Sequence, residues 1–143
     1  MPLRISIVEY NPQWPELYQL EAGRIRTILG SRVLRLEHIG STSVSGLAAK
    51  PVVDMTLAVV DSADEEAYAP ALEGAGYELR IREANWHEHR MFNGPGTDIN
   101  LHVFSSGCPE IERILLFRDW LRECRRSRFL LADQVSPGSE GMD

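Results

Sequence analysis

The sequence has few cysteines and no excess of positive charge. Its two cysteines, Cys108 and Cys124, form no Cys-x-x-Cys pair, so that metal or redox motif is excluded and we expect two packed or surface thiols. The formal net charge is −6, whereas proteins that bind nucleic acid through its phosphate backbone rely on a basic surface. General nucleic-acid binding is therefore not expected, although a local basic patch is compatible with this charge.

Long apolar runs are also missing. A membrane-spanning helix needs roughly 20 consecutive apolar residues, and no stretch approaches that length. Residues 1–9 have too short an apolar segment for a secretory signal and no cleavage pattern. With 43% hydrophobic and 25% charged residues, the composition is typical of a soluble globular protein. We therefore expect a cytoplasmic protein that does not act at a membrane.

The chain length of 143 residues predicts one domain. Apolar periodicity and turn residues predict an α+β protein. The expected strands are 4–10, 33–39, 52–60, 77–81 and 98–104, and the expected helices are 15–30, 61–73 and 110–126. The last residues are polar and rich in serine and glycine. We therefore predict a domain over residues 1–126 and a flexible C-terminal tail over residues 127–143.

The strongest functional signal lies between the two expected strands at 33–39 and 52–60. Gly40 allows a sharp turn that exposes successive backbone N–H groups. Hydroxyl donors follow it at Ser41, Thr42 and Ser43. A loop of this kind can hold an anion of the size of a phosphate.

Charged and titratable residues flank this loop. Asp54 lies inside an apolar run, where a carboxylate is costly to bury without a hydrogen-bond partner or a cation. Lys50 precedes Pro51, which favours an extended backbone, so its ammonium group can reach the loop or Asp54; a surface lysine is the alternative. His38 can contact a bound phosphate or serve as a hydrogen-bonded structural group.

Two further segments carry candidate residues. Arg90 precedes the apolar pair Met91-Phe92 and is a candidate for a cleft residue. His87 and His89 would share one face of a strand, but no third ligand accompanies them, so structural zinc is only weakly supported. The strand over 98–104 places Asn100 and His102 on one polar face. That face either belongs to a site or is hydrogen-bonded across the sheet.

Several segments of the sequence resemble the GrpB family (UPF0157). They are His-Ile-Gly-Ser-Thr-Ser-Val-Ser-Gly-Leu-Ala-Ala-Lys-Pro-Val-Val-Asp at 38–54, Leu-His-Val at 101–103, Phe-Arg-Asp-Trp-Leu-Arg at 117–122 and the opening Val-Glu-Tyr-Asn-Pro-Gln-Trp at 8–14. The family is largely uncharacterised, is related to polymerase β-like nucleotidyltransferases, and is sometimes fused to dephospho-CoA kinase. The resemblance covers roughly residues 3–122 and implies a two-layer mixed sheet with helices mainly on one face.

The resemblance also implies roles for the candidate residues. In the nucleotidyltransferases, a Gly-Ser pair grips the triphosphate and two acidic residues on one strand face bind magnesium. Gly40 and Ser41 match the Gly-Ser pair, and Asp54 matches the first acidic residue. Thr56 occupies the position of the second acidic residue, and its hydroxyl binds magnesium far more weakly than a carboxylate does. A later strand supplies a third ligand, so Asp54 and His102 are the expected metal pair, with Asn100 at a position where the family commonly has histidine.

Two functions follow from the resemblance. The first is magnesium-dependent transfer of a nucleotidyl group from an NTP to an unknown acceptor, with Lys50 or Arg118 balancing phosphate charge. The second is a catalytically degenerate module that binds a nucleotide or another phosphorylated small molecule, linked to CoA metabolism through the fusions. The family usually continues with another amphipathic helix, and without it an open core face would favour a homodimer or a marginally stable domain.

Overall fold

The computed structural model of the chain describes residues 7–95 and 98–134, with side chains described up to residue 126. Its strands are β1 (Arg35–Ile39), β2 (Val53–Val59), β3 (Glu78–Glu83), β4 (His89–Asn93) and β5 (Ile99–Ser105). The α-helices are α1 (Trp14–Leu29), α2 (Ala69–Gly74) and α3 (Pro109–Gln134). Short 3-10 turns occur at Gly30–Arg32, Ser41–Ser43 and Glu65–Ala67.

The five strands form one mixed sheet in the order β1-β2-β5-β4-β3. β2 and β5 run parallel, and the other neighbouring pairs are antiparallel. This arrangement confirms the predicted α+β class with a mixed sheet. It also puts β2, which carries Asp54, directly between β1 and β5, so the side chains of three strands meet around that residue.

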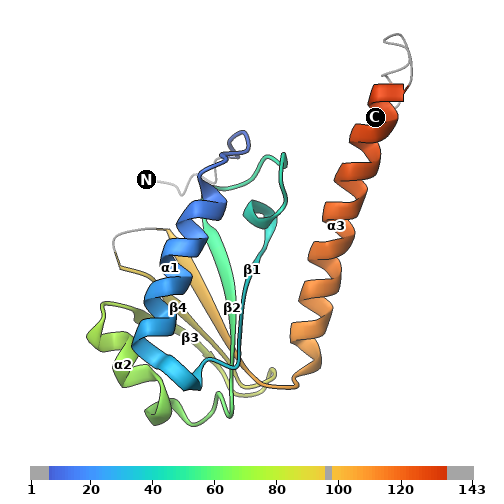
Figure 1. Cartoon of the computed structure of the whole chain (residues 1–143). Helices are drawn as coiled ribbons and strands as arrows, with labels where there is room; N and C mark the ends of the chain where they lie inside the picture. Colours follow the sequence, from blue (N-terminus) through green and yellow to red (C-terminus); the bar gives the residue numbers. More distant parts are fainter. Residues whose placement is uncertain (1–6, 96–97, 135–143) are drawn as a thin grey trace, which may run out of the picture.

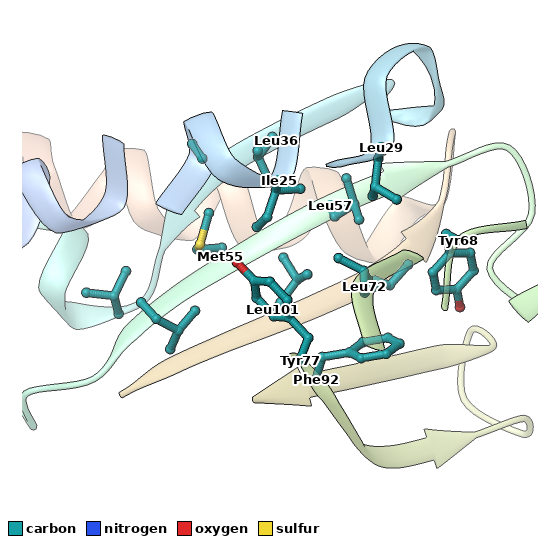
Figure 2. Packing of buried hydrophobic residues seen from close by; sticks show 14 of the residues in the cluster. Ile25, Leu29, Leu36, Met55, Leu57, Tyr68, Leu72, Tyr77, Phe92 and Leu101 are labelled. Atoms are coloured by element: carbon teal, nitrogen blue, oxygen red, sulfur yellow. The ribbon is translucent and has the colours of Figure 1, made fainter. Parts of the chain in front are cut away.

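Helices α1 and α2 cover one face of the sheet (Figure 1). α1 forms because its apolar residues recur at helical spacing and Pro15 occupies the first turn, where a missing N–H costs nothing. Figure 2 shows Ile25 and Leu29 of α1 packed over Met55 and Leu57 of β2. These four side chains are almost completely buried, so this layer holds the main hydrophobic core.

Helix α3 packs on the other face of the sheet. Ile111 and Leu115 of α3 pack in a smaller cluster with Ile39, Ala58 and Phe104. Figure 1 shows α3 beside β1, at one edge of the sheet. Because the helix covers only part of this face, the polar residues of β2 and β5 remain accessible from one side.

The structure shifts several predicted boundaries. α3 continues past the predicted end at residue 126 to Gln134, and the helix predicted over 61–73 is reduced to a 3-10 turn and the short α2. Residues 4–6 of the first predicted strand lie outside the described residues, and Val8 forms a single bridge with Ala49. The division at residue 126 falls inside α3, and the division itself stays a prediction.

None of the helices within residues 7–95 and 98–134 combines the length and the apolar character needed to cross a bilayer.

Candidate functional site

The loop after β1 is held directly against Asp54. Gly40 has φ +76° and ψ −177°, a region that is essentially restricted to glycine. A Cβ atom at this position would lie 2.7 Å from Oδ2 of Asp54. Gly40 is therefore required both by the backbone angle and by the close approach of the carboxylate. The sequence-based expectation that the bend and the acid face a common space agrees with this contact.

Two of the three loop hydroxyls are used inside the protein. Thr42 Oγ1 donates to the carbonyl of Val52 at 3.1 Å and lies 3.0 Å from His38 Nε2. Ser43 Oγ donates to the carbonyl of Gly40 at 2.5 Å, and both residues are buried. Only Ser41 is exposed, so it is the hydroxyl that the loop can offer to a ligand.

His38 belongs to this internal network. Its ring stacks on Tyr18, with the ring centroids 4.9 Å apart. Burial, with a smaller contribution from Arg122, lowers the pKa of His38 to about 4, so the ring is neutral at pH 7 and donates to Thr42 through Nε2. Of the two roles open to His38 from the sequence, the contacts favour the structural one.

The carboxylate of Asp54 is anchored on one side and open on the other. Asn100 Nδ2 donates to Asp54 Oδ1 at 3.1 Å, and His102 Nε2 lies 3.5 Å from the same oxygen. Among the described residues, no lysine or arginine forms an ion pair with Asp54, and 29% of its side chain is exposed. The acid is thus positioned by β5 without being neutralised by a cationic side chain.

A chain of hydrogen bonds fixes the orientation of His102. Glu83 Oε1 lies 2.6 Å from His89 Nδ1, and His89 Nε2 lies 3.0 Å from His102 Nδ1. Burial lowers the pKa of His89, which favours a neutral ring that donates to Glu83 and accepts from His102. His102 Nδ1 then donates to His89, and His102 Nε2 faces Asp54 Oδ1.

A parallel chain of amides fixes Asn100. Arg80 Nε donates to Asn93 Oδ1 at 3.0 Å, and Asn93 Nδ2 donates to Asn100 Oδ1 at 2.8 Å. The oxygen of Asn100 is therefore occupied, and its NH₂ group is directed to Asp54. Asn100 acts here as a donor that orients the carboxylate.

Thr56 cannot replace the missing second acid. It lies on the same strand face as Asp54, opposite Glu37 of β1 and His102 of β5. The residue is 1% exposed and its Oγ1 has no hydrogen-bond partner among the described residues. Glu37 is itself paired with Arg118, at 3.0 Å. One free carboxylate, that of Asp54, thus remains on this part of the sheet.

Two hollows adjoin Asp54, and together we call them the Asp54 cleft. The larger has a volume of about 360 Å³ and the smaller about 220 Å³, and Ser41 and Asp54 line both. Lys50 lines the smaller one. The larger is lined by Gly40, His102 and Arg118 and by the aromatic rings of Trp86, Phe104 and Phe117. The cleft therefore has a polar end that is large enough for an anion such as phosphate, and a wall of aromatic rings.

Arg90 is not brought to this cleft. It pairs with Val103 in the sheet and is directed toward the α1–α2 layer, where it is 4% exposed and lies 2.5 Å from Glu65. The hydrogen bonds from Arg82 and Arg90 lower the pKa of Glu65 to about 2. The expectation of a cleft arginine fails at this position because Met91, not Arg90, faces the side of His102.

The expectation for His87 and His89 also needs correction. β4 begins at His89, while His87 and Glu88 lie in the preceding turn with positive φ values of 56° and 49°. The two histidines therefore do not share a strand face. The sequence reasoning missed the partnership of His89 with Glu83 and His102, and it missed Trp86 and Phe117 as cleft residues. The only signal in the sequence was their proximity to the candidate strands.

The residues of the cleft fit one divalent cation better than two. In the described part of the chain, no group of three or more His, Cys, Asp or Glu side chains is placed to hold a metal ion. Asp54 and His102 provide one carboxylate and one imidazole nitrogen, whereas magnesium prefers oxygen ligands and paired sites need several carboxylates. The remaining ligands of a single cation would have to come from a bound phosphate or from water.

The fold is that of the nucleotidyltransferases. The structure of Cid1 in complex with its short product ApU superposes with a TM-score of 0.57 over 80% of this chain and 37% of that chain, at 12% identity. A cytoplasmic RNA terminal U-transferase gives a TM-score of 0.54 at 14% identity, over 79% of this chain and 35% of that one. At these identities the similarity concerns the fold alone.

The chain belongs to the GrpB family. The family described as "GrpB protein" matches residues 4–131. The crystal structure of the conserved protein GrpB from Enterococcus faecalis superposes with a TM-score of 0.75 at 31% identity, covering 90% of this chain and 83% of that one. The UPF0157 protein BH1888 of Halalkalibacterium halodurans is 62% identical over 118 residues, which are 82% of this chain and 60% of that protein.

The chain spans about 60% of the length of such curated relatives. A dephospho-CoA kinase of Mycolicibacterium paratuberculosis is 30% identical over 144 residues, covering 82% of this chain and 35% of that protein. The relationship to these kinases therefore concerns a part of their length.

Proposed function

We propose that the Asp54 cleft binds a nucleoside triphosphate and transfers its nucleotidyl group to an acceptor. The single observation that supports this proposal is the contact between Gly40 and Asp54, because the polar bend and a carboxylate with no described cationic partner then line one cleft. Similarity of the fold to nucleotidyltransferases supports the same reaction class.

The polar end of the cleft suits the phosphates. Ser41 offers its hydroxyl and Lys50 its ammonium group in the smaller hollow, and Arg118 lines the larger one. Arg118 already donates to Glu37 and to the carbonyl of His38 at 3.0 and 3.1 Å, so it is held in place before a ligand arrives. Such preorganised donors stabilise transferred phosphoryl charge without rearrangement.

The aromatic wall suits the base. Trp86 and Phe117 are 43% and 56% exposed although both line the cleft. Exposed rings beside a polar pocket are suited to stacking on a flat heterocycle, and a stacked base contributes about 1–3 kcal/mol. We infer that these two residues contact the base or another flat part of the ligand.

In the transfer, an oxygen of the acceptor forms a bond to the α-phosphorus while the bond from this phosphorus to the bridging oxygen breaks. Pyrophosphate leaves, and the acceptor's proton passes to solvent by way of Asp54. A divalent cation held by Asp54 and His102 would neutralise phosphate charge during this step. Glu83 and His89 are positioning residues, because they orient His102 without reaching the cleft carboxylate themselves.

The second candidate is a binding module that has lost the transfer chemistry. The buried, unpartnered Thr56 favours it, because the strand face offers one free carboxylate where paired cations need more. In this case the ligand is a nucleotide or another phosphorylated small molecule. The partial match to dephospho-CoA kinases makes CoA precursors reasonable ligands to include.

One experiment separates the two candidates. Thermal unfolding of the full chain is measured with each NTP and with CoA precursors, with magnesium or manganese and with EDTA, beside an assay for pyrophosphate release. The enzyme requires cation-dependent stabilisation and turnover that Asp54→Asn abolishes. The binding module requires stabilisation that survives EDTA, without turnover. Stabilisation by none of these compounds would contradict both.

A further inference from the structure

A third hollow lies beside Ser45 and Gly46, further along the same loop. It has a volume of about 540 Å³ and is lined by Ser45, Gly46, Arg122, Arg125 and Arg126; we call it the arginine hollow. No acidic residue is among its lining residues in the described part of the chain. A space surrounded by three guanidinium groups and two small neutral residues has a positive potential, although the chain as a whole carries a net charge of −6.

The helix spacing explains why the arginines gather here. Arg118, Arg122 and Arg125 follow one another at intervals of four and three residues, so they lie on one face of α3. This face is turned toward the loop between β1 and β2, which Figure 1 shows beside α3. Arg122 Nε donates to the carbonyl of Ser43 at 3.0 Å, and Arg125 Nη2 donates to the carbonyl of Gly46 at 2.6 Å.

Gly46 permits the contact with Arg125. Its φ is +82°, and a Cβ atom there would lie 2.8 Å from Arg125 Nη2. The bond at Gly46 and that at Ser43 each occupy one of the five N–H donors of a guanidinium group. Within the described residues, the other donors of Arg122 and Arg125 form no hydrogen bond, so they can bind a ligand together with Arg126.

The positive charge of these side chains is only weakly compensated. The acidic partner nearest to Arg122 is Asp119, at 3.8 Å. Arg126 pairs with Glu123 at 3.3 Å, and both of these side chains are 65% exposed, so water and salt screen the pair. Burial and the nearby Arg118 lower the pKa of Arg122, as expected where like charges gather without enough anions.

We propose that the arginine hollow binds a phosphate or diphosphate group of a small phosphorylated molecule. Guanidinium groups match phosphate oxygens in charge and in geometry. The hollow is larger than one phosphate needs, which leaves room for a second phosphate or for the group that carries it. The acidic balance of the chain argues against a long nucleic acid as the occupant. Since the same loop borders the Asp54 cleft, the bound molecule is suited to be an acceptor or a regulator.

Arg126→Gln is the sharpest variant, because Arg126 makes no contact with the loop among the described interactions. Arg113→Gln is its matched control. Arg113 is an exposed arginine of the same helix, at 67%, and its partner Glu110 also lies three residues away. Both variants remove one positive charge and one ion pair from α3. They differ in the hollow that the arginine lines, because Arg126 lines the arginine hollow and Arg113 lines the larger hollow of the Asp54 cleft.

The experiment titrates inorganic pyrophosphate into the full chain in EDTA and measures heat. EDTA removes any cation-dependent binding at the Asp54 cleft. We expect binding that Arg126→Gln weakens about tenfold, as for one charge-assisted contact, and that Arg122→Gln/Arg126→Gln abolishes. Arg113→Gln and Lys50→Gln should bind like the natural chain. Thermal unfolding of each variant checks that it is folded.

The outcomes distinguish this site from the Asp54 cleft. Binding that Lys50→Gln abolishes and Arg126→Gln leaves unchanged would assign pyrophosphate to the cleft and overturn the proposal. Equal weakening by Arg113→Gln and Arg126→Gln would overturn it too, because binding would then not be specific to the arginine hollow. Absence of pyrophosphate binding, or binding of a single-stranded oligonucleotide in preference to pyrophosphate, would also contradict it. Failure of pyrophosphate binding at the arginine hollow would leave the nucleotide titrations of the Asp54 cleft unaffected.

Discussion

The replacement Gly40→Ala tests the contact on which the proposed function depends. The new side chain meets two separate costs. The first is the backbone conformation at φ +76° and ψ −177°, which costs a residue other than glycine about 1–3 kcal/mol. The second is the Cβ atom 2.7 Å from Asp54 Oδ2, which forces the carboxylate away from Asn100 and His102.

Gly30→Ala is the matched control. Gly30 also has a positive φ, +58°, but a Cβ atom there would meet nothing within 4 Å. Because Gly30 has ψ −127°, a sparsely populated region, we expect Gly30→Ala to lower stability by about 1–3 kcal/mol through the backbone alone. Gly40→Ala should lower it by roughly 1 kcal/mol more than Gly30→Ala, for the lost hydrogen bond to Asp54.

The assay is urea unfolding of both variants, combined with nucleotide titration monitored by thermal unfolding. For a chain of this size, each kcal/mol corresponds to a change in Tm of about 3 °C. Gly40→Ala should also weaken nucleotide binding, whereas Gly30→Ala should not. If the two variants lose equal stability and Gly40→Ala binds nucleotide normally, the contact between loop and acid has no functional role and the reasoning is refuted.

Three further predictions test the assignment of neighbouring residues. Burial lowers the pKa of His38 from 6.5 to about 4, so the stability that comes from keeping this ring neutral is complete above pH 6.5 and is lost as the pH falls from 6.5 to about 4. Urea unfolding should show a loss of at most about 3 kcal/mol in unfolding free energy over this range, and His38→Gln should reduce that loss. Arg90→Met leaves Glu65 with fewer partners and should lower the unfolding free energy by about 2–3 kcal/mol. It should not change nucleotide binding, because Arg90 lies on the face of the sheet opposite the Asp54 cleft, and weaker binding would contradict that placement. Thr56→Val removes a buried hydroxyl that has no described partner and should raise the unfolding free energy by about 1 kcal/mol; a destabilised variant would show that this hydroxyl has a partner.

The parts of the fold and site that sequence reasoning found are those set by local spacing. Alternation over 98–104 placed Asn100 and His102 on one face, and the structure directs both toward Asp54. The glycine and hydroxyls at 40–43 predicted a tight polar bend, and a 3-10 turn is present at Ser41–Ser43. Periodicity alone was sufficient for these features because each depends on neighbours in the chain.

The parts that it missed depend on which strands are adjacent. His89 reaches His102 only because β4 lies next to β5, and Glu83 reaches His89 only because β3 lies next to β4. Arg90 was misplaced because the sequence did not reveal that β4 begins at His89, which determines the face that each residue occupies. Sheet order and register result from packing across the whole chain, so no local pattern encodes them.

The three hydroxyls of the loop over 41–43 have different roles, although they are adjacent in the sequence. Thr42 is bonded to the carbonyl of Val52 and to His38, and Ser43 is bonded to the carbonyl of Gly40. These internal bonds hold the bend in one conformation, and that conformation exposes Ser41 beside Asp54. Because binding to a rigid site avoids the cost of ordering it, we propose that the two buried hydroxyls favour ligand binding by keeping the loop rigid. Substitutions of Thr42 or Ser43 should therefore change stability first, and substitutions of Ser41 should change binding with little effect on stability.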